Sequence, residues 1–468
     1  MNFEKLFING EWIDGASGNF IEVLDVGTKA VMARVPRGNE EDVNLAVSAA
    51  LKAQEAWQEK TPEERIAYVQ KALDYLRAHQ DEITDIEISE LGQPYDWTHQ
   101  THVLRNFSRI ESYLEVAKNF QYERGTREST LRYEPVGVVA CLTPWNYPLG
   151  QVVQKVIPAL LGGNTIVLKP SQHTPLTVYY MLEAFRQAGL PKGVFNLVTG
   201  AGSEVGHYLT LHKDVTMVSF TGSTSAGRQV GRESLSTIKK FSLELGGKSP
   251  ALFLPHADYD KYLPIVAQSC FSNSGQTCAA YTRLVVPESD YTEVIGKLAP
   301  IAQTWQAGLP RDEGTKLGPL INHQAFLKVK GYIEKGLADG AQLLFGNIPV
   351  DDGKDIIGPT IFGKVTPEMS IVRDEIFGPV LVIQTYTTLE EGICLANDTN
   401  YGLAAAIFGA PEEAIAASKR LKAGQIYLNS GVRDIMAPFG GYKESGLGRE
   451  GGPMGFEEFL EVKAVFID

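Results

Sequence analysis

Two hydrophobic patterns alternate along the middle of the chain, between Val136 and Leu254. Short apolar runs rich in β-branched residues predict strands at 136–142, 165–168, 194–198, 216–220 and 241–245. The segments between them predict helices at 151–161, 175–188, 203–211 and 225–235. Alternating strands and helices form βαβ units, so we expect an α/β fold whose parallel sheet carries helices on both faces.

The flanking regions predict further elements. The chain begins with strand-like pieces such as Lys5–Ile8 and continues as helices over Glu40–Lys60 and Pro62–Leu91. Residues 122–133 predict a two-stranded ribbon that turns near Gly125, and the tail predicts a strand, most clearly over Val462–Ile467. A lone hairpin is marginally stable and exposes its edges, so we expect the ribbon and tail to form an oligomerisation sheet.

Length, composition and net charge limit the kinds of protein that this chain can be. A chain of 468 residues is too long for one hydrophobic core, and 44% hydrophobic with 21% charged residues is ordinary globular usage. The net charge of −13 argues against nucleic acid or an anionic membrane as partner. No stretch approaches the roughly 18 apolar residues of a membrane span, and the N-terminus lacks a secretory apolar region, so we expect a cytoplasmic protein.

The cysteines and histidines predict neither a disulfide framework nor a metal site. The four cysteines form no CxxC pair, which fits reduced thiols. Cys141, Cys270 and Cys394 are expected to serve packing. His99 and His102 would share a helical face, but no third ligand stands nearby, so we predict ordinary helix-surface histidines.

Unusual residues follow the predicted strands of the sheet. The segments that come directly after four strands are 143–146, 169–172, 221–223 and 244–247. Because ligands of open parallel sheets bind at the carboxyl ends of the strands, we expect these segments to line one crevice. Gly222 and Ser223, just before a helix, would offer backbone N–H groups to a pyrophosphate, and Lys169 adds a cation.

Two other glycine motifs are weaker signals for phosphate. Residues 246–249 imitate the end of a P-loop, but Ser242 stands where that loop needs its first glycine. Residues 200–206 nearly match the dinucleotide pattern GxGxxG, with the last glycine one residue late. We interpret this second segment as a tight strand-to-helix turn.

Three residues in these and later loops supply the groups needed to make and break an acyl-thioester. Cys278 offers a thiol nucleophile, Glu244 a carboxylate base and Asn146 an amide donor. Taken singly, a buried cysteine usually serves packing and a glutamate at a strand end usually caps a turn. Their motif context favours the catalytic interpretation.

The motifs around these residues resemble those of the aldehyde dehydrogenase superfamily, in family order and over nearly the whole chain. They are Pro144-Trp145-Asn146, Lys169-Pro170-Ser171, Phe220-Thr221-Gly222-Ser223, Glu244-Leu245-Gly246-Gly247-Lys248, Gly275-Gln276-Thr277-Cys278, Glu375-Ile376-Phe377-Gly378-Pro379 and Pro438-Phe439-Gly440-Gly441-Tyr442-Lys443-Glu444-Ser445-Gly446. The resemblance implies oxidation of an aldehyde to a carboxylic acid with NAD or NADP.

The resemblance also implies roles for single residues. Cys278 would attack the aldehyde, and the Asn146 side chain with the Cys278 backbone N–H would form the oxyanion hole. After oxidation of the thiohemiacetal, Glu244 would activate water to hydrolyse the thioester. Glu450 would be an accessory carboxylate near the water path, or else a plain surface ion pair with Arg449.

The cofactor contacts follow in the same way. Glu375 would hold the nicotinamide ribose, Phe377 would pack beside the nicotinamide, and Lys169 would reach the adenosine ribose. The remaining cofactor-binding residues would be Trp145, Ser171, Gln172, Gly222, Ser223 and Gly246. Members that favour NAD often carry a glutamate where this chain has Gln172, so exclusion of NADP is open; Gln172 could also serve simply as a ribose ligand with NAD still preferred.

The resemblance places the aldehyde tunnel along the helix after Tyr147 and the loop before Pro438, with Phe439 as a further substrate residue. Gln151 and Gln154 would share a helical face and give that tunnel polar walls. Arg433 could bind a substrate carboxylate, unless Asp434 neutralises it. The alternative is that these polar residues are ordinary solvated side chains.

The pattern and the resemblance together predict the domain organisation. Residues 1–113 and 135–246 would form a Rossmann-like cofactor domain, 247–446 an α/β catalytic domain, and 114–134 with 447–468 a small β oligomerisation element. The family resemblance implies a homodimer or homotetramer. Two other functions stay open: transfer of the thioester to coenzyme A, which Glu244 disfavours, and a non-catalytic role on the same scaffold.

Overall fold

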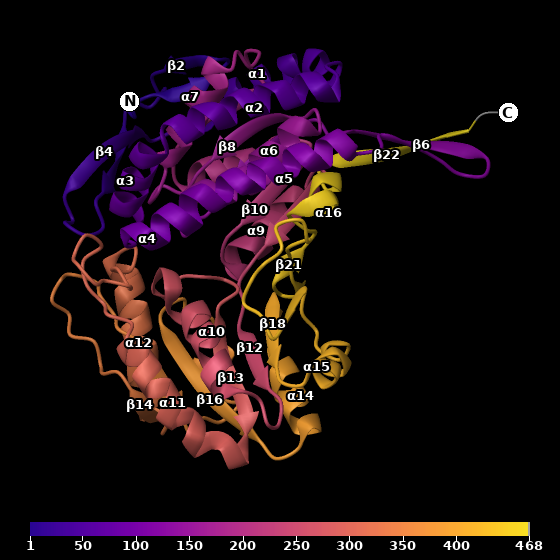
Figure 1. Ribbon diagram of the computed structural model, residues 1–468. Coiled ribbons are helices and arrows are strands. Elements are labelled where there is room, and N and C mark those ends of the chain that lie inside the picture. The colour runs from indigo at the N-terminus through magenta and orange to yellow at the C-terminus, as the bar shows by residue number, and fades with distance from the viewer. Residues whose placement is uncertain (467–468) are drawn as a thin grey trace.

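The computed structural model describes residues 1–466 as two lobes, each built on a largely parallel sheet (Figure 1). The eight-stranded sheet of the first lobe has the order β2, β1, β9, β8, β7, β10, β11, β21. Its strands are, in that order, Glu11–Ile13, Leu6–Ile8, Phe195–Leu197, Thr165–Lys169, Val138–Leu142, Met217–Thr221, Lys240–Glu244 and Gly446–Leu447. The central five strands are parallel, and this confirms the predicted alternation of strands and helices.

Helices cover both faces of this sheet because side chains alternate along each strand. In β7, Val139 and Cys141 join a core with the helices of one face, whereas Val138, Ala140 and Leu142 join the core of the other face. The first face carries α2 (Pro62–Ala78), α5 (Arg105–Asn119), α6 (Pro148–Leu161) and α7 (Thr177–Gln187), and the second carries α1 (Glu40–Gln58), α8 (His207–Leu211) and α9 (Thr224–Ser234).

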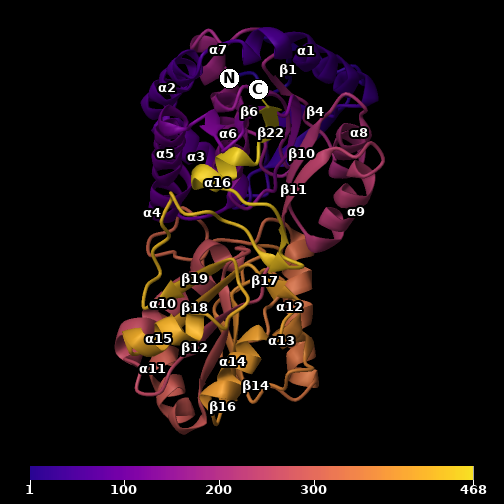
Figure 2. The same ribbon diagram turned by 90° about the vertical axis from the view of Figure 1, so that its right-hand side faces the viewer.

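The second lobe contains seven strands in the order β14, β15, β16, β13, β12, β18, β19. They are Gln342–Phe345, Thr360–Gly363, Val380–Tyr386, Tyr281–Pro287, Ser249–Phe253, Ala404–Phe408 and Gln425–Leu428, and only β14 runs antiparallel. The helices packed around them are α10 (Tyr259–Phe271), α11 (Tyr291–Gln303), α12 (His323–Ala338), α14 (Leu389–Asn397) and α15 (Pro411–Ser418). Figure 2 shows the segment before β21 passing between the lobes.

A three-stranded sheet projects from the first lobe (Figure 1). Strands β5 (Glu123–Gly125) and β6 (Ser129–Pro135) form the predicted ribbon, and β22 (Leu460–Phe466) pairs with β6 over its whole length. Ile467, where the predicted tail strand ends, lies outside the described residues. Helix α5 continues through the predicted domain boundary at residue 113.

Two local predictions are wrong. The single helix predicted over 62–91 is divided at His79 into α2 and α3 (Gln80–Leu91). The His79 ring contacts the carbonyl oxygen of Tyr75 at 2.8 Å and stacks on its ring, so a side chain occupies the acceptor that a continuing helix would use. Cys394, assigned to packing, is exposed because Ile393 and Ala396 take the core-facing side of α14.

Across residues 1–466, no helix combines the length and the apolar character that a membrane crossing would need. The predicted strand-to-helix turn at residues 200–206 is present, as a π-helical turn (Gly202–Gly206) that leads into α8. The P-loop alternative for residues 246–249 is excluded, because strand β12 and not a helix begins at Ser249.

Candidate active site

Cys278 lies in a tight loop that joins α10 to β13. The loop enters through Asn273 and Ser274, whose φ angles are 57° and 56°, and Gly275 follows with φ of 72°. A Cβ atom on Gly275 would lie 2.2 Å from the carbonyl carbon of Gly378, so only glycine fits there. Backbone strain of this kind is typical of functional loops, and it fixes where the Cys278 thiol stands.

Side chains of the first lobe hold this loop. The Asn146 amide donates to the carbonyl oxygen of Gln276 at 2.9 Å, and the Asn273 amide donates to the carbonyl oxygen of Asn146 at 3.0 Å. The Tyr147 hydroxyl contacts Thr277 Oγ1 at 2.8 Å. The part of the nucleophile loop that leads to Cys278 is therefore connected to the segment after β7, although the two are far apart in sequence.

Glu244 ends strand β11 and is buried. Neither of its carboxylate oxygens has a hydrogen-bond partner among the described residues. A Cβ atom on Gly440 would lie 2.5 Å from Glu244 Oε1, so the missing side chain at 440 leaves room for this carboxylate. Burial and the nearby Glu450 carboxylate raise the pKa of Glu244 well above its usual range.

The surroundings of Cys278 oppose its ionisation. Burial, then the carboxylates of Glu375 and Glu244, raise the pKa of the thiol to about 12. The protein groups alone therefore keep the thiol protonated at neutral pH. A positive charge brought beside it would favour the thiolate.

Two cavities meet at Cys278. The smaller one, of about 180 Å³, is also lined by Trp145, Asn146, Glu375 and Phe377. The larger one, of about 650 Å³, is lined by residues of both lobes. Gln151 and Cys278 belong to the walls of both cavities, so a molecule in either one can reach the sulfur atom.

The smaller cavity contains most of the predicted cofactor residues. Trp145 and Phe377 meet edge to face with centroids 5.5 Å apart, and Phe377 has a left-handed φ of 64°. Glu375 Oε1 accepts from the Gly247 backbone N–H at 3.0 Å. A Cβ atom on Gly246 would lie 2.4 Å from Glu375 Oε2, so the carboxylate lies directly against the backbone.

Gly222 and Ser223 form the opposite wall of the smaller cavity. Ser223 stands just before a helix, as predicted; it is the N-cap of α9, and its hydroxyl accepts from the Ala226 N–H at 3.3 Å. Helix α9 therefore directs its free N–H groups toward this wall. A Cβ atom on Gly222 would lie 2.5 Å from the Phe220 ring.

Lys169 ends strand β8, which lies next to β7 in the sheet, and Ser171 and Gln172 follow it; none of the three lines either cavity. Lys169 is buried, and burial lowers its pKa to about 8. Ser171 accepts from the His173 backbone N–H at 3.2 Å. Gln172 is half-buried, and within residues 1–466 its side chain forms no hydrogen bond.

The larger cavity contains the predicted substrate residues Tyr147, Gln151, Gln154, Arg433 and Phe439. Arg433 lies over the Phe439 ring at 4.1 Å and donates to Gln154 Oε1 at 3.4 Å. The alternative that these are ordinary solvated side chains does not hold for Gln151 and Gln154, which are buried. Two further arginines in this wall, Arg105 and Arg109, were not predicted from the sequence.

A buried ion pair stands behind the site. Lys155 of α6 pairs with Glu450, and both side chains are buried. Lys155 also donates to Ser219 Oγ at 3.3 Å. The interpretation of Glu450 as a surface partner of Arg449 is wrong, because the chain brings Glu450 back under the first sheet, where its backbone pairs with Phe439. Lys155, one residue after Gln154 in an apolar helix, was a signal that sequence reasoning missed.

The prediction that His102 is a helix-surface histidine is wrong. His102 is buried, contacts Glu87 at 3.1 Å and stacks on Tyr147. Burial lowers its pKa to about 3, so the ring is neutral. No group of three or more His, Cys, Asp or Glu residues positioned for a metal ion occurs within 1–466.

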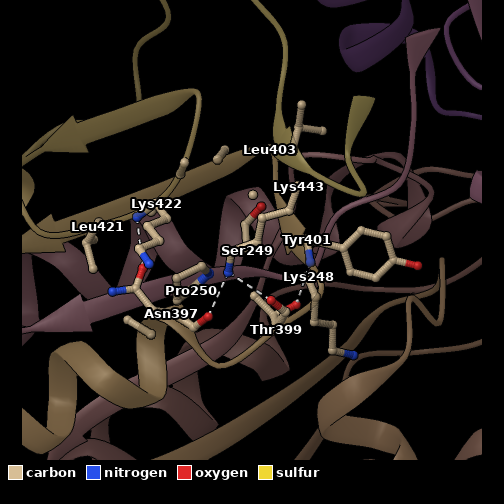
Figure 3. A pocket seen from close by; sticks show the side chains of 15 residues that line it. Lys248, Ser249, Pro250, Asn397, Thr399, Tyr401, Leu403, Leu421, Lys422 and Lys443 are labelled. Carbon is tan, nitrogen blue, oxygen red and sulfur yellow. Dashed lines mark hydrogen bonds between the residues drawn. The ribbon is translucent and has the colours of Figure 1, made fainter. Parts of the chain in front are cut away.

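A further small cavity lies in the second lobe, away from Cys278 (Figure 3). The Lys443 amine reaches across it and donates to the carbonyl oxygens of Asn397 at 2.8 Å and Thr399 at 2.9 Å. Its free volume of about 10 Å³ has room for roughly one water molecule. This cavity is therefore no competitor for the substrate site.

Comparison with known proteins agrees with this geometry. The model of the aldehyde dehydrogenase family matches residues 12–465. The chain belongs to the aldehyde dehydrogenase family. It is therefore an NAD(P)-dependent oxidoreductase that acts on aldehydes, and the predicted fold class, family and cofactor class are confirmed.

Three solved structures illustrate the likeness of this dehydrogenase to its relatives. A cysteine-to-alanine mutant of aldehyde dehydrogenase C from Pseudomonas syringae, in complex with NAD⁺ and octanal, is 38% identical, covers 99% of this chain and 97% of its own, and has a TM-score of 0.97. Mycobacterium tuberculosis aldehyde dehydrogenase with NAD⁺ is 37% identical, covers 100% of this chain and 99% of its own, and has a TM-score of 0.97. An NADP-dependent Escherichia coli enzyme is 34% identical, covers 99% of this chain and 98% of its own, and has a TM-score of 0.96.

Proposed function

We propose that this aldehyde dehydrogenase forms a thioester on Cys278 and hydrolyses it with water activated by Glu244. The observation that carries the proposal is the position of the thiol at the junction of two cavities. One cavity has the glycine, aromatic and helix-terminal walls that suit a dinucleotide, and the other opens toward solvent between the lobes. A thiol placed there can meet an aldehyde from one side and a hydride acceptor from the other.

The first step is addition of the Cys278 sulfur to the aldehyde carbon, which gives a thiohemiacetal. The developing oxyanion needs donors. The Asn146 amide carries two N–H bonds, and its hydrogen bond to Gln276 occupies one of them and orients the group. The second N–H and the Cys278 backbone N–H would complete the oxyanion hole.

Glu244 acts in the second half of the reaction. Because its oxygens have no partner among the described residues and its raised pKa makes it a stronger base, this carboxylate is suited to take a proton from water. The water would attack the thioester carbon, and the acid would leave as the thiol is regenerated. The buried ion pair of Lys155 and Glu450 would hold the charges near Glu244 in fixed positions.

The residues of the smaller cavity fit NAD or NADP. Glu375, held against Gly246 and Gly247, would bind ribose hydroxyls, and the N-terminus of α9 at Ser223 would face the pyrophosphate. Trp145 and Phe377 would pack against the nicotinamide. When bound, the cofactor supplies the acceptor for the hydride. Lys169 and Ser171, with Gln172, would hold the adenosine ribose.

The choice between NAD and NADP depends on Gln172 in this proposal. Both NAD⁺ complexes and an NADP-dependent enzyme occur among the similar structures, so the family scaffold accepts either. Gln172 is neutral and free of hydrogen bonds to the described residues. It would therefore bind a ribose diol without repelling a 2′-phosphate.

The projecting sheet would join protomers into a homodimer or homotetramer. Val462 and Phe466 of β22 are exposed, at 54% and 78%. An exposed strand edge with apolar side chains favours pairing with another chain. We keep the predicted division into cofactor, catalytic and oligomerisation segments, and the cytoplasmic location, as parts of this proposal.

The test is a screen for reduced cofactor with aliphatic, aromatic and carboxylated aldehydes and both cofactors. Wild type should oxidise some of them, and Cys278→Ala should lose this activity while keeping cofactor affinity. Cys270→Ser is the matched control, since Cys270 is buried in α10 away from the cavities. Substantial turnover by Cys278→Ala would show that the nucleophile is assigned wrongly.

A further inference from the structure

The larger cavity carries a charge opposite to that of the protein. Three arginines line it, Arg105, Arg109 and Arg433, and no aspartate, glutamate, lysine or histidine is among its lining residues. The chain as a whole has a net charge of −13. A cationic cavity in an acidic protein is a local feature that average composition does not explain.

Two of the arginines come from one helix. Arg105 and Arg109 are four residues apart at the start of α5 and point to the same side. Gly150 of α6 makes room for the second one, because a Cβ atom there would lie 3.1 Å from Arg109 Nη1. Arg109 Nη1 also donates to Asn106 Oδ1 at 2.6 Å, which fixes its direction.

The third arginine comes from the loop after β19, more than 300 residues later in the chain. Arg105 Nη2 donates to the backbone oxygen of Arg433 at 3.4 Å. Asp434 does not neutralise Arg433: Asp434 Oδ1 accepts from the Met436 N–H at 2.9 Å, the Arg433 guanidinium donates to Gln154, and no ion pair joins Arg433 and Asp434. The tertiary fold thus gathers three guanidinium groups at one wall.

None of the three has a counter-ion within residues 1–466. Several surface arginines of this chain do pair, as Arg34 does with Glu4 and Arg37 with Glu204. Glu450 is the nearby acid that acts on Arg433, and it is already paired with Lys155. Burial, then repulsion from Arg433 and Arg105, lowers the pKa of Arg109 to about 9. A bound anion would relieve this repulsion.

We propose that the substrate of this enzyme is an aldehyde that carries an anionic group, a carboxylate or phosphate, bound by Arg105, Arg109 and Arg433 while its carbonyl group meets Cys278. The same cavity wall contains the thiol and the arginines, so one molecule can touch both. The guanidinium fork matches carboxylate and phosphate oxygens in pairs. This inference rests on the proposed thioester chemistry and adds the substrate class.

The experiment compares matched aldehydes on the wild-type enzyme. The pairs are adipic semialdehyde against hexanal, para-carboxybenzaldehyde against para-methylbenzaldehyde, and glyceraldehyde phosphate against glyceraldehyde. We expect kcat/KM for the anionic member of at least one pair to exceed that of its neutral partner by tenfold or more. The first two pairs test a carboxylate as the anionic group, and the third pair tests a phosphate. Equal or better turnover of every neutral partner would overturn the proposal.

Substitutions of the arginines test whether these side chains cause the preference for anionic aldehydes. Arg109→Gln and Arg433→Gln should each reduce the anionic-to-neutral ratio of kcat/KM by about tenfold, mainly through KM, whereas Arg109→Lys should keep part of the preference. Arg34→Gln, at an exposed surface pair, is the matched control and should leave the ratio unchanged. An unchanged ratio in both cavity variants would also overturn the proposal.

An inhibition measurement on the wild type tests the proposal even if the arginine variants fold poorly. Adipate and inorganic phosphate are tested as competitive inhibitors of hexanal oxidation by the wild type, with hexanol as the neutral reference. Stronger inhibition by either anion supports the cationic subsite, and weaker inhibition by both contradicts it. If no aldehyde at all is oxidised, the proposed function fails; if neutral aldehydes are oxidised without any preference for anions, only this inference fails.

Discussion

The side-chain amide of Asn146 donates a hydrogen bond of 2.9 Å to the backbone oxygen of Gln276, two residues before Cys278. In the proposed mechanism the remaining amide N–H donates to the oxyanion. We expect Asn146→Ala to lower kcat by about 100-fold to 1,000-fold, the loss seen when one oxyanion donor is removed. Steady-state kinetics measure this. Asn119→Ala, at the exposed end of α5, is the control and should stay within twofold of wild type.

Glu244→Gln should separate the two halves of the reaction. Without its base, water attacks the thioester slowly, so one equivalent of reduced cofactor should appear per active site and then little more. Stopped-flow absorbance measures the burst and the steady rate. A variant with neither burst nor turnover would mean that Glu244 acts earlier, in activating Cys278.

Gln172→Glu should change the cofactor preference. If the neutral amide admits a 2′-phosphate, wild type should use NADP within about tenfold of NAD, and the new carboxylate should depress kcat/KM for NADP far more than for NAD. Lys169→Ala should weaken both cofactors. The measured quantity is kcat/KM for each cofactor in all three proteins. An unchanged NADP/NAD ratio in Gln172→Glu would move the selector to a neighbour such as His173.

Alkylation of Cys278 should depend strongly on pH. The pKa of the thiol is raised to about 12, so the reactive thiolate is scarce at neutral pH and increases as pH rises. We expect the rate of iodoacetamide labelling in the protein without cofactor to rise by about tenfold per pH unit between pH 7 and 9. Mass spectrometry after tryptic digestion follows the labelled peptide. A rate that levels off below pH 8 would show a much lower pKa.

Turnover, like the labelling of Cys278, should increase as the pH rises from the acid side. Glu244 must be ionised to act as a base, and its pKa is raised, so its active form is lost as pH falls. We therefore expect kcat of the wild type to fall on the acid side. In Glu244→Gln the small remaining steady rate should no longer follow that acid limb.

The buried pair of Lys155 and Glu450 should matter for stability. Lys155→Met leaves a buried carboxylate without its partner, which costs about 3–5 kcal/mol. The double replacement Lys155→Met with Glu450→Leu should recover much of this loss. Lys192→Met, at the exposed pair with Glu11, is the matched control and should change stability by less than about 1 kcal/mol. Thermal unfolding followed by circular dichroism compares the four proteins. Equal stability of Lys155→Met and wild type would contradict the role of the pair.

Sequence periodicity by itself determined the alternating strands and helices of the first lobe, because a buried parallel strand needs a short continuous apolar run that a helix does not. It also determined that Asn146 and Glu244 stand at the carboxyl ends of two such runs, which the structure places as β7 and β11 with β10 between them. The glycines at 246 and 275 were visible as motifs, and their close backbone contacts explain them.

Other features depended on contacts between residues far apart in the chain. The break at His79 depends on a side-chain contact with Tyr75, and Glu450 is buried only because the chain returns beneath the first sheet. Arg105 and Arg109 have the four-residue spacing of a solvated helix face, so the sequence could not tell that they face a cavity. The tertiary structure decided this by placing α6 and the Arg433 loop against them, since the direction of a helix face is set by what packs on it.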